Sequence, residues 1–198
     1  MLIGIIGGSG VYEIFRASED KRIATPYGGP SAPYAIGDIS GERCAFLPRH
    51  GRSHNIPTDK VNYRANIWGF KELGVERIIS ISASGGINPS LKPGDIVVVE
   101  QIIDMVQGMR PSSFYDKNEV VHIDFTDPYC PELALLIRKA SEQTGIPLKK
   151  ATYICVNGPR LETRAEIKFF GSIGADIVGM TAMPETVLAR ELEMCFGA

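Results

Sequence analysis

Short apolar runs of the strand type alternate with helical patterns along the chain, and this alternation constrains the fold more than any other feature. The strand-type runs are nearly continuous and rich in β-branched residues, which is typical of strands covered on both faces. They occupy residues 2–6, 45–47, 77–82, 95–100 and 151–156. Helices are expected at residues 62–73, 131–144, 163–170 and 184–193. Strands that alternate with helices predict an α/β domain with a largely central sheet.

Length and charge exclude several classes of protein. The chain has 198 residues, of which 44% are hydrophobic and 22% charged, and its formal net charge is −2. That length predicts a single domain over residues 1–198. The charge balance provides no basic field for nucleic acid, and no apolar run approaches the roughly 18–20 residues of a membrane span. The opening MLIGIIGG has no cationic start, so we expect a buried strand and not a signal peptide. The scattered cysteines indicate a cytoplasmic protein.

The cysteines and histidines do not indicate a metal site. The four cysteines are scattered without a CxxC pair, so we expect them to stay reduced and to behave as small apolar residues. His50 and His54 lie in one short segment, but no third or fourth ligand follows at a usual zinc spacing. The sequence therefore predicts neither a metal nor a cofactor.

A glycine turn, GGSG, follows the first strand at residues 7–10. It does not match the dinucleotide pattern GxGxxG, because Glu13 stands where the third glycine belongs, and it lacks the lysine of a P-loop. Its backbone N–H groups and the hydroxyl of Ser9 can still approach an anion closely. A tight turn without a ligand is the alternative.

Two further stretches offer donors to an anion. RHGRSHNIP, at residues 49–57, places two arginines and two histidines after a strand. SISASGGI, at residues 80–87, ends another strand with small hydroxyl residues, the kind of crevice that binds ligands in open α/β sheets. A solvated basic loop and a plain turn are the respective alternatives.

Two later stretches open helices. In NGPRLETRAE, residues 157–166, the carboxylate of Glu162 either accepts a hydrogen bond from a ligand or compensates the helix dipole. In GMTAMPE, residues 179–185, Thr181 either faces an anion or caps the helix, and Glu185 is expected to serve the helix dipole. The long loops 26–33 and 108–129 carry aromatic residues, which favours a functional role over disorder.

In this order, six blocks resemble the trimeric purine nucleoside phosphorylase and methylthioadenosine phosphorylase family. They are GIIGGSG, PRHGRSHNIP, VNYRANIW, GMRPSSFYD, GPRLETRAE and GMTAMPE, and the resemblance covers essentially the whole chain. It implies the nucleoside phosphorylase fold, a mixed, twisted central sheet flanked by helices, assembled as a homotrimer or a dimer of trimers. It also implies phosphorolysis of a purine nucleoside to the free base and a ribose 1-phosphate or methylthioribose 1-phosphate, with inorganic phosphate as co-substrate.

The resemblance also implies roles for individual residues. Arg52 and His54 would lie beside the phosphate, Met180 under the ribose, and His122 at the 5′ end of the sugar in a neighbouring subunit. No residue would act as a covalent nucleophile, because the enzyme would work by positioning and electrostatics. Phosphate itself would be bound by Ser9, Arg49, His50, Ser82, Ala83 and Thr181.

The pair Leu161-Glu162 bears on which purine is cleaved. Family members that cleave 6-aminopurine nucleosides typically have a small hydroxyl residue in place of Glu162, and those specific for 6-oxopurines have Glu. A carboxylate accepts the N1–H of hypoxanthine or guanine, whereas N1 of adenine carries only a lone pair, and such a mismatch costs about 1–3 kcal/mol. We therefore expect inosine, guanosine or 5′-methylthioinosine as the substrate, with methylthioadenosine as the alternative.

The last residues resemble the start of another buried strand, at 194–196. Compared with the family, the chain is expected to lack the C-terminal strand, the base-binding loop with its Asp or Asn, and the final helix. A chain that binds phosphate without turnover is therefore one alternative. A nucleosidase that uses water is another, and a dinucleotide-dependent oxidoreductase is disfavoured by Glu13.

Overall fold

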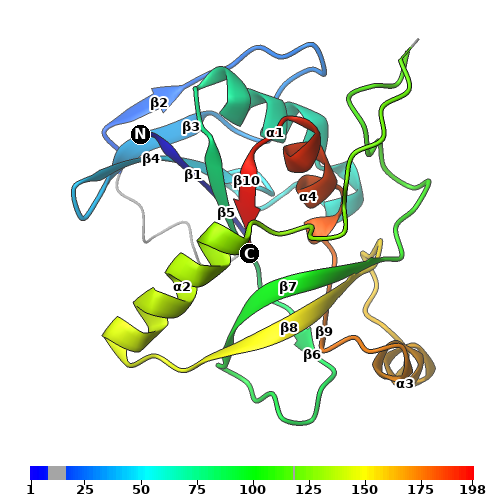
Figure 1. Ribbon diagram of the computed structural model, residues 1–198. Helices are drawn as coiled ribbons and strands as arrows, with labels where there is room; N and C mark the ends of the chain where they lie inside the picture. The colour runs from blue at the N-terminus through cyan, green and yellow to red at the C-terminus, as the bar shows by residue number, and fades with distance from the viewer. Residues whose placement is uncertain (9–16, 118) are drawn as a thin grey trace.

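The computed structural model describes residues 1–8, 17–117 and 119–198. Its strands form two sheets with helices on their flanks (Figure 1). This arrangement confirms a mixed α/β class, although the strands are divided between two sheets and do not form one central sheet.

The first sheet has β1 near its centre. Its order across the sheet is β10 (Cys195–Gly197), β5 (Arg77–Ile81), β1 (Ile3–Gly7), β4 (Glu42–Pro48), β3 (Tyr34–Ile39) and β2 (Glu19–Lys21). β10, β5, β1 and β4 are parallel neighbours, whereas β3 and β2 are antiparallel additions. Because parallel strands end at the same edge, the chain leaves β1, β4 and β5 side by side.

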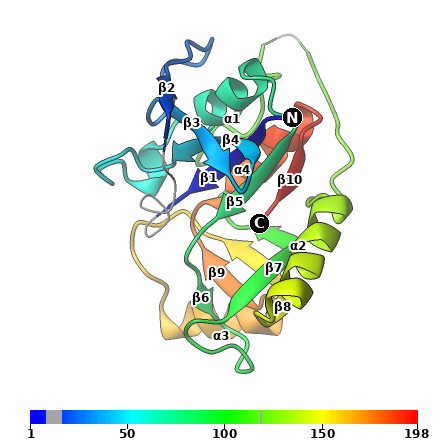
Figure 2. The same ribbon diagram turned by 90° about the vertical axis from the view of Figure 1, so that its left-hand side faces the viewer.

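The second sheet lies below the first in Figure 2, and the chain runs from β5 directly into it. Its order is β6 (Gly85–Gly86), β9 (Ile177–Gly179), β8 (Leu148–Cys155) and β7 (Ile96–Asp104). β7, β8 and β9 are parallel, and β6 is antiparallel to β9. The last residue joins the two sheets, because the backbone N–H of Val99 in β7 donates to the carbonyl of Ala198.

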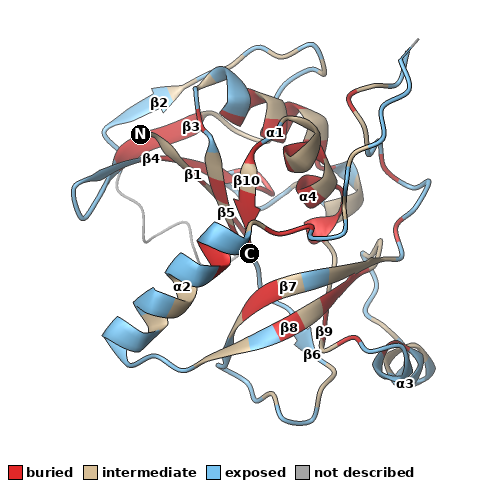
Figure 3. Ribbon diagram, in the orientation of Figure 1, coloured by how far each residue is buried: buried red, intermediate tan, exposed pale blue. Residues whose placement is uncertain are grey.

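The helices begin and end where local chemistry dictates. Pro131 opens α2 (Pro131–Thr144), and Gly145 closes it in the left-handed conformation, so the predicted bounds are confirmed. Asn62 caps α1 (Tyr63–Glu72) by accepting from the N–H of Ala65. The other helices are the 3-10 turn η1 (Thr58–Lys60), α3 (Arg164–Ser172) and α4 (Ala182–Glu191). Figure 3 shows α2 and α3 mostly exposed, whereas α1 and α4 are largely buried.

The packing of α1 on β3 depends on one glycine. A Cβ on Gly69 would overlap the hydroxyl group of Tyr34, so only glycine allows this ring to pass. The Tyr34 hydroxyl donates to the carbonyl of Asn66 at 2.7 Å, and its ring meets Phe70 edge-on at 4.9 Å. The polar end of a fully buried tyrosine is thereby satisfied.

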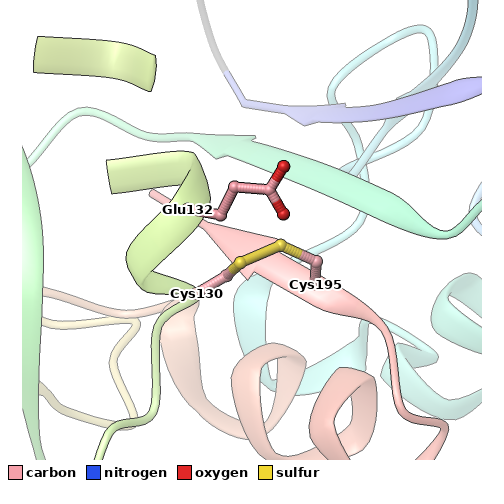
Figure 4. Close-up of side chains that lie close together, drawn as sticks. All are labelled: Cys130, Glu132 and Cys195. Carbon is pink, nitrogen blue, oxygen red and sulfur yellow. A yellow bond between two sulfur atoms is a disulfide. The ribbon is translucent and has the colours of Figure 1, made fainter. Parts of the chain in front are cut away.

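The prediction that all four cysteines stay reduced is wrong for two of them. Cys130, just before α2, and Cys195, in β10, form a disulfide (Figure 4). They are 65 residues apart in sequence, so spacing gave no sign of the pair. The backbone N–H of Cys130 donates to the carbonyl of Phe196 at 2.8 Å, which brings the two cysteines together. Cys44 and Cys155 are buried and not disulfide-bonded, as expected.

The predicted strand at 194–196 is confirmed as β10, which pairs with β5. Four strands were not predicted, namely β2, β3, β6 and β9. β6 and β9 have only two and three residues, which is too short for any alternation of apolar and polar positions.

Removing the disulfide should lower stability. We expect the Cys130→Ser, Cys195→Ser double variant to lose about 2–4 kcal/mol of unfolding free energy, because the bond restricts the unfolded chain. Urea unfolding without reductant measures the loss.

Reductant provides the internal control for that comparison. Reductant should lower the urea midpoint of the wild type and leave the urea midpoint of the double variant unchanged. Thiol titration of the unfolded wild type should find two thiols before reduction and four after it. Four thiols before reduction would contradict the bond.

Candidate active site

The carboxyl ends of both sheets' parallel strands meet around one cavity of about 500 Å³. Segments that follow β1, β4 and β5 form one side, and segments that follow β8 and β9 form the other. Ligands of open α/β sheets bind at such edges. The lining residues are Gly8, Arg49, His50, His54, Asn55, Ile56, Pro57, Thr58, Ser82, Ala83, Gly85, Pro159, Leu161, Glu162, Val178, Gly179, Met180 and Thr181.

Most of the predicted site residues lie together in this cavity. Those that line it are Arg49, His50, His54, Ser82, Ala83, Leu161, Glu162, Met180 and Thr181. They come from four stretches of sequence, which the fold brings together. Ser9 lies outside the described residues; the residue before it in sequence, Gly8, lines the cavity.

Two predicted residues lie elsewhere. Arg52 is exposed, pairs with Asp20, and lines a separate hollow beside β2. His122 is exposed on the long segment between β7 and α2 and does not line the cavity of its own chain. The role of His122 in a neighbouring subunit stays a prediction.

Arg49 and Glu185 form a fully buried ion pair behind the cavity. Nε of Arg49 donates to one carboxylate oxygen of Glu185, and Nη2 donates to the other at 3.1 Å. Nη2 also donates to the hydroxyl group of Ser80 at 2.8 Å. Burial opposes the charge of Arg49, but Glu185 more than offsets this, so the pKa of Arg49 is raised and the guanidinium stays charged.

The expectation that Glu185 serves the helix dipole is therefore corrected. Its position in the first turn of α4 agrees with that role, but both its oxygens face Arg49 across the core. The two residues are 136 positions apart, so nothing in the local sequence could indicate the pair.

His50 is oriented by the backbone. Its Nδ1 lies 2.9 Å from the carbonyl oxygen of Ile56, and since a carbonyl only accepts, Nδ1 carries the proton. Burial lowers the pKa of His50, so the ring is neutral near pH 7. The ring of His54 lies 4.7 Å from it. Nε2 is thus the nitrogen of His50 left for a ligand.

Thr181 does not cap its helix. It occupies the N-cap position of α4, but its side chain makes no capping hydrogen bond. Its backbone N–H lies 3.4 Å from the hydroxyl oxygen of Tyr153, whose ring fills the space beside Gly179. The interpretation of Thr181 as a helix cap is therefore not supported. Thr181 lines the cavity instead.

Glu162 is not needed for the helix that follows it. Thr163 and Glu166 form a complete capping box at the start of α3, and Arg160 donates to both carboxylate oxygens of Glu166. Those contacts lower the pKa of Glu166 to about 2, with the hydrogen bond from Arg160 as the main cause. Glu166 therefore compensates the dipole of α3, and Glu162 lines the cavity.

No metal-binding cluster borders the cavity within the described residues. One group of ligand-type side chains does lie close together, Cys130, Glu132 and Cys195, but its two sulfur atoms are joined (Figure 4). Among the described helices, none combines the length and apolar character required to cross a bilayer.

Breaking the buried pair should be costly. We expect Glu185→Gln to lose about 3–5 kcal/mol of unfolding free energy, because it leaves the charge of Arg49 buried without its partner. Urea unfolding measures the loss, and Glu72→Gln, on the exposed side of α1, is the matched control.

A double variant sharpens this test. The double variant Arg49→Met, Glu185→Met should lose less unfolding free energy than the single variants Arg49→Met and Glu185→Met lose together, since it removes both charges at once. A Glu185→Gln variant as stable as the Glu72→Gln control would contradict the stabilising role of the pair.

Comparisons with known proteins agree with this geometry. The chain is 55% identical over 197 residues to the probable S-methyl-5′-thioinosine phosphorylase of Thermodesulfovibrio yellowstonii, covering 99% of this chain and 74% of the relative. It is 52% identical over 197 residues to the S-methyl-5′-thioadenosine phosphorylase of Thermofilum pendens, covering 98% of this chain and 75% of that relative.

A solved structure of similar fold is the methylthioadenosine phosphorylase from Schistosoma mansoni in complex with adenine. Its TM-score is 0.93 at 34% sequence identity, and the match covers 98% of this chain and 79% of that one. This similarity confirms the nucleoside phosphorylase fold that the sequence blocks implied. The sequence profile of the Phosphorylase superfamily matches residues 2–198. The chain belongs to the phosphorylase superfamily.

Proposed function

We propose that this protein is a purine nucleoside phosphorylase, a pentosyltransferase that prefers 6-oxopurine nucleosides and uses inorganic phosphate as the nucleophile. One observation carries the proposal. A single cavity contains oxyanion donors at the strand ends on one side and the carboxylate of Glu162 on the other. The relatives named above support phosphorolysis of purine nucleosides as the reaction.

Phosphate would lie at the edge of the first sheet. Ser82 and Ala83 follow β5, His50 follows β4, and all three line the cavity together with Gly8. Nη1 of Arg49 lies 3.4 Å from where a Cβ on Gly8 would stand, which places a guanidinium edge beside this space. Thr181 approaches from the second sheet, and Ser9 would complete the set.

The buried charge at the phosphate end of the cavity is balanced, so phosphate would be bound without being trapped. Arg49 is already matched by Glu185, so its charge does not add a full unpaired cation. Neutral hydroxyl and N–H groups then provide most of the binding. Phosphate has to act as a nucleophile, and a site that binds it with moderate affinity leaves it reactive.

In the proposed reaction, phosphate attacks C1′ of the sugar from one face. The bond between C1′ and purine N9 breaks, a bond from C1′ to a phosphate oxygen forms, and the electron pair leaves with the purine, which takes up a proton. Positive charge on the sugar in the transition state is stabilised by the phosphate below it. The enzyme contributes position and preorganised electrostatics, without a covalent intermediate or a cofactor.

Glu162 is the group that we assign to purine preference, with Leu161 beside it on the cavity rim. It would accept the N1–H of a 6-oxopurine, and Glu166 already serves the helix. One relative is named for S-methyl-5′-thioinosine, whose base is the 6-oxopurine hypoxanthine. Methylthioadenosine is the second candidate, since the other relative and the solved structure are named for it.

The remaining assignments belong to the same proposal. Met180 would lie under the sugar and His54 beside the phosphate, and both line the cavity. His122, exposed here, would reach the sugar of a neighbouring subunit in a homotrimer or dimer of trimers. Arg52 would lie near the phosphate only if its pairing with Asp20 changed. Cytoplasmic location stays a prediction.

Release of free base tests the reaction and the preference together. We expect phosphate-dependent release from inosine, guanosine and methylthioinosine, with kcat/KM roughly 5–150-fold above that for methylthioadenosine, the ratio that a 1–3 kcal/mol mismatch produces. Glu162→Ser should narrow this ratio. Glu119→Gln, an exposed position outside the cavity, is the control.

Other outcomes identify the alternatives. Faster release from methylthioadenosine, unchanged in Glu162→Ser, would favour the second candidate. Release without phosphate would indicate a nucleosidase, and phosphate binding without any release would indicate a binding protein.

Titration of His50 tests the phosphate end independently. In the free protein, NMR should find its midpoint below the ordinary histidine value, because burial lowers its pKa. Added phosphate should raise the midpoint, since a nearby anion stabilises the protonated ring. Chloride at equal ionic strength is the control, and an unchanged midpoint would place phosphate away from His50.

A further inference from the structure

A second buried arginine, Arg110, lies behind the opposite wall of the cavity. It is 7% exposed and follows β7 on the long segment that leads to α2. Among the ion pairs of the described residues none includes Arg110. A buried cation without a carboxylate requires other compensation, because desolvation of a charge is costly.

Backbone carbonyls provide that compensation. Nη1 of Arg110 donates to the carbonyl oxygens of Met180 at 2.7 Å and Met183 at 2.8 Å, and Nη2 donates to that of Asn157 at 2.7 Å. Nη1 also lies 3.1 Å from the hydroxyl oxygen of Tyr63, whose ring lies 5.1 Å from the guanidinium carbon. Hydrogen bonds from a charged donor are roughly twice as strong as neutral ones.

These acceptors lie in or next to three separate segments that line the cavity, although only Met180 among them lines it directly. Asn157 opens the segment that carries Leu161 and Glu162, and Met180 adjoins Thr181. Tyr63 donates to the carbonyl of Thr58, which also lines the cavity. Arg110 itself does not line it, so it can act on a ligand only through these segments.

The start of α4 explains why a side-chain donor is needed there. Met183 has a φ of −109° and a ψ of 132°, which are not helical, so the first turn of α4 is broken at this residue. Regular helix hydrogen bonds do not hold such a turn in place. Arg110 therefore holds the strand-to-helix junction from the side.

We infer that Arg110 is a positioning residue that fixes the Met180–Thr181 wall relative to the Glu162 wall. The inference rests on the proposed function, in which these walls hold the sugar and phosphate and the base. A planar guanidinium reaches acceptors in different directions at once, whereas the ammonium of lysine is a compact point charge. Arg110→Lys would keep the charge and lose this geometry.

The test is the steady-state kinetics of Arg110→Lys with phosphate and the preferred nucleoside. We expect kcat/KM to fall about 100-fold, the size of effect that a displacement of about 1 Å can cause. The nucleoside KM should rise, and the ratio between oxopurine and aminopurine substrates should narrow. Arg138→Lys, at a partly exposed arginine paired with Glu100, should leave all three values unchanged.

A merely structural role would not change substrate preference in the folded enzyme, so folding is checked by circular dichroism at the assay temperature. Added guanidinium ion, at concentrations that do not denature, should restore part of the activity of Arg110→Ala and have no effect on Arg138→Ala. If Arg110→Lys does not fold, Tyr63→Phe, which removes one acceptor, should show the same changes at smaller size.

The outcomes separate the two proposals. A wild type that releases no base from any nucleoside overturns both. An active wild type with a folded Arg110→Lys variant of equal kcat/KM and equal preference overturns only the role of Arg110. The same holds if Tyr63→Phe, tested in its place, keeps the wild-type KM and preference.

Discussion

The buried pair of Arg49 and Glu185 is the interaction on which the rest of the site depends. Arg49 stands at the end of β4, and Glu185 stands in the first turn of α4, which follows the second sheet. Neither charge is stable in the core alone, so each requires the other to stay in place. The pair thereby joins the carboxyl edge of the first sheet to the helix that follows β9, behind the cavity that Arg49 lines.

Arg110 has the complementary place on the other side. Arg49 is compensated by a carboxylate, whereas Arg110 is compensated by the carbonyl dipoles of Asn157, Met180 and Met183. Neither guanidinium carries its full charge into the cavity. In the proposal, phosphate and purine are then bound mainly by directional hydrogen bonds. This suits a reaction that depends on the relative position of two substrates.

Local chemistry made some elements predictable. The bounds of α2 follow from Pro131 and Gly145, and the start of α3 follows from Thr163 and Glu166, because these contacts lie within one turn of the helix end. β6 and β9 are too short for a pattern; β6 forms by pairing with β9, and β9 by pairing with β8 and β6. The disulfide and the Arg49–Glu185 pair link residues 65 and 136 positions apart, so no local pattern indicates either one.

The sequence by itself determined the alternation of strands and helices, the family blocks, and the kinds of donors that end each strand. It left two interpretations open for Glu162 and for Thr181, namely a contact with a ligand or a role at the start of a helix. The capping of α3 by Thr163 and Glu166 is local, but only the tertiary structure placed Glu162 and Thr181 around one cavity. The physical reason is that capping is a short-range hydrogen bond, whereas a cavity forms only when distant strand ends converge.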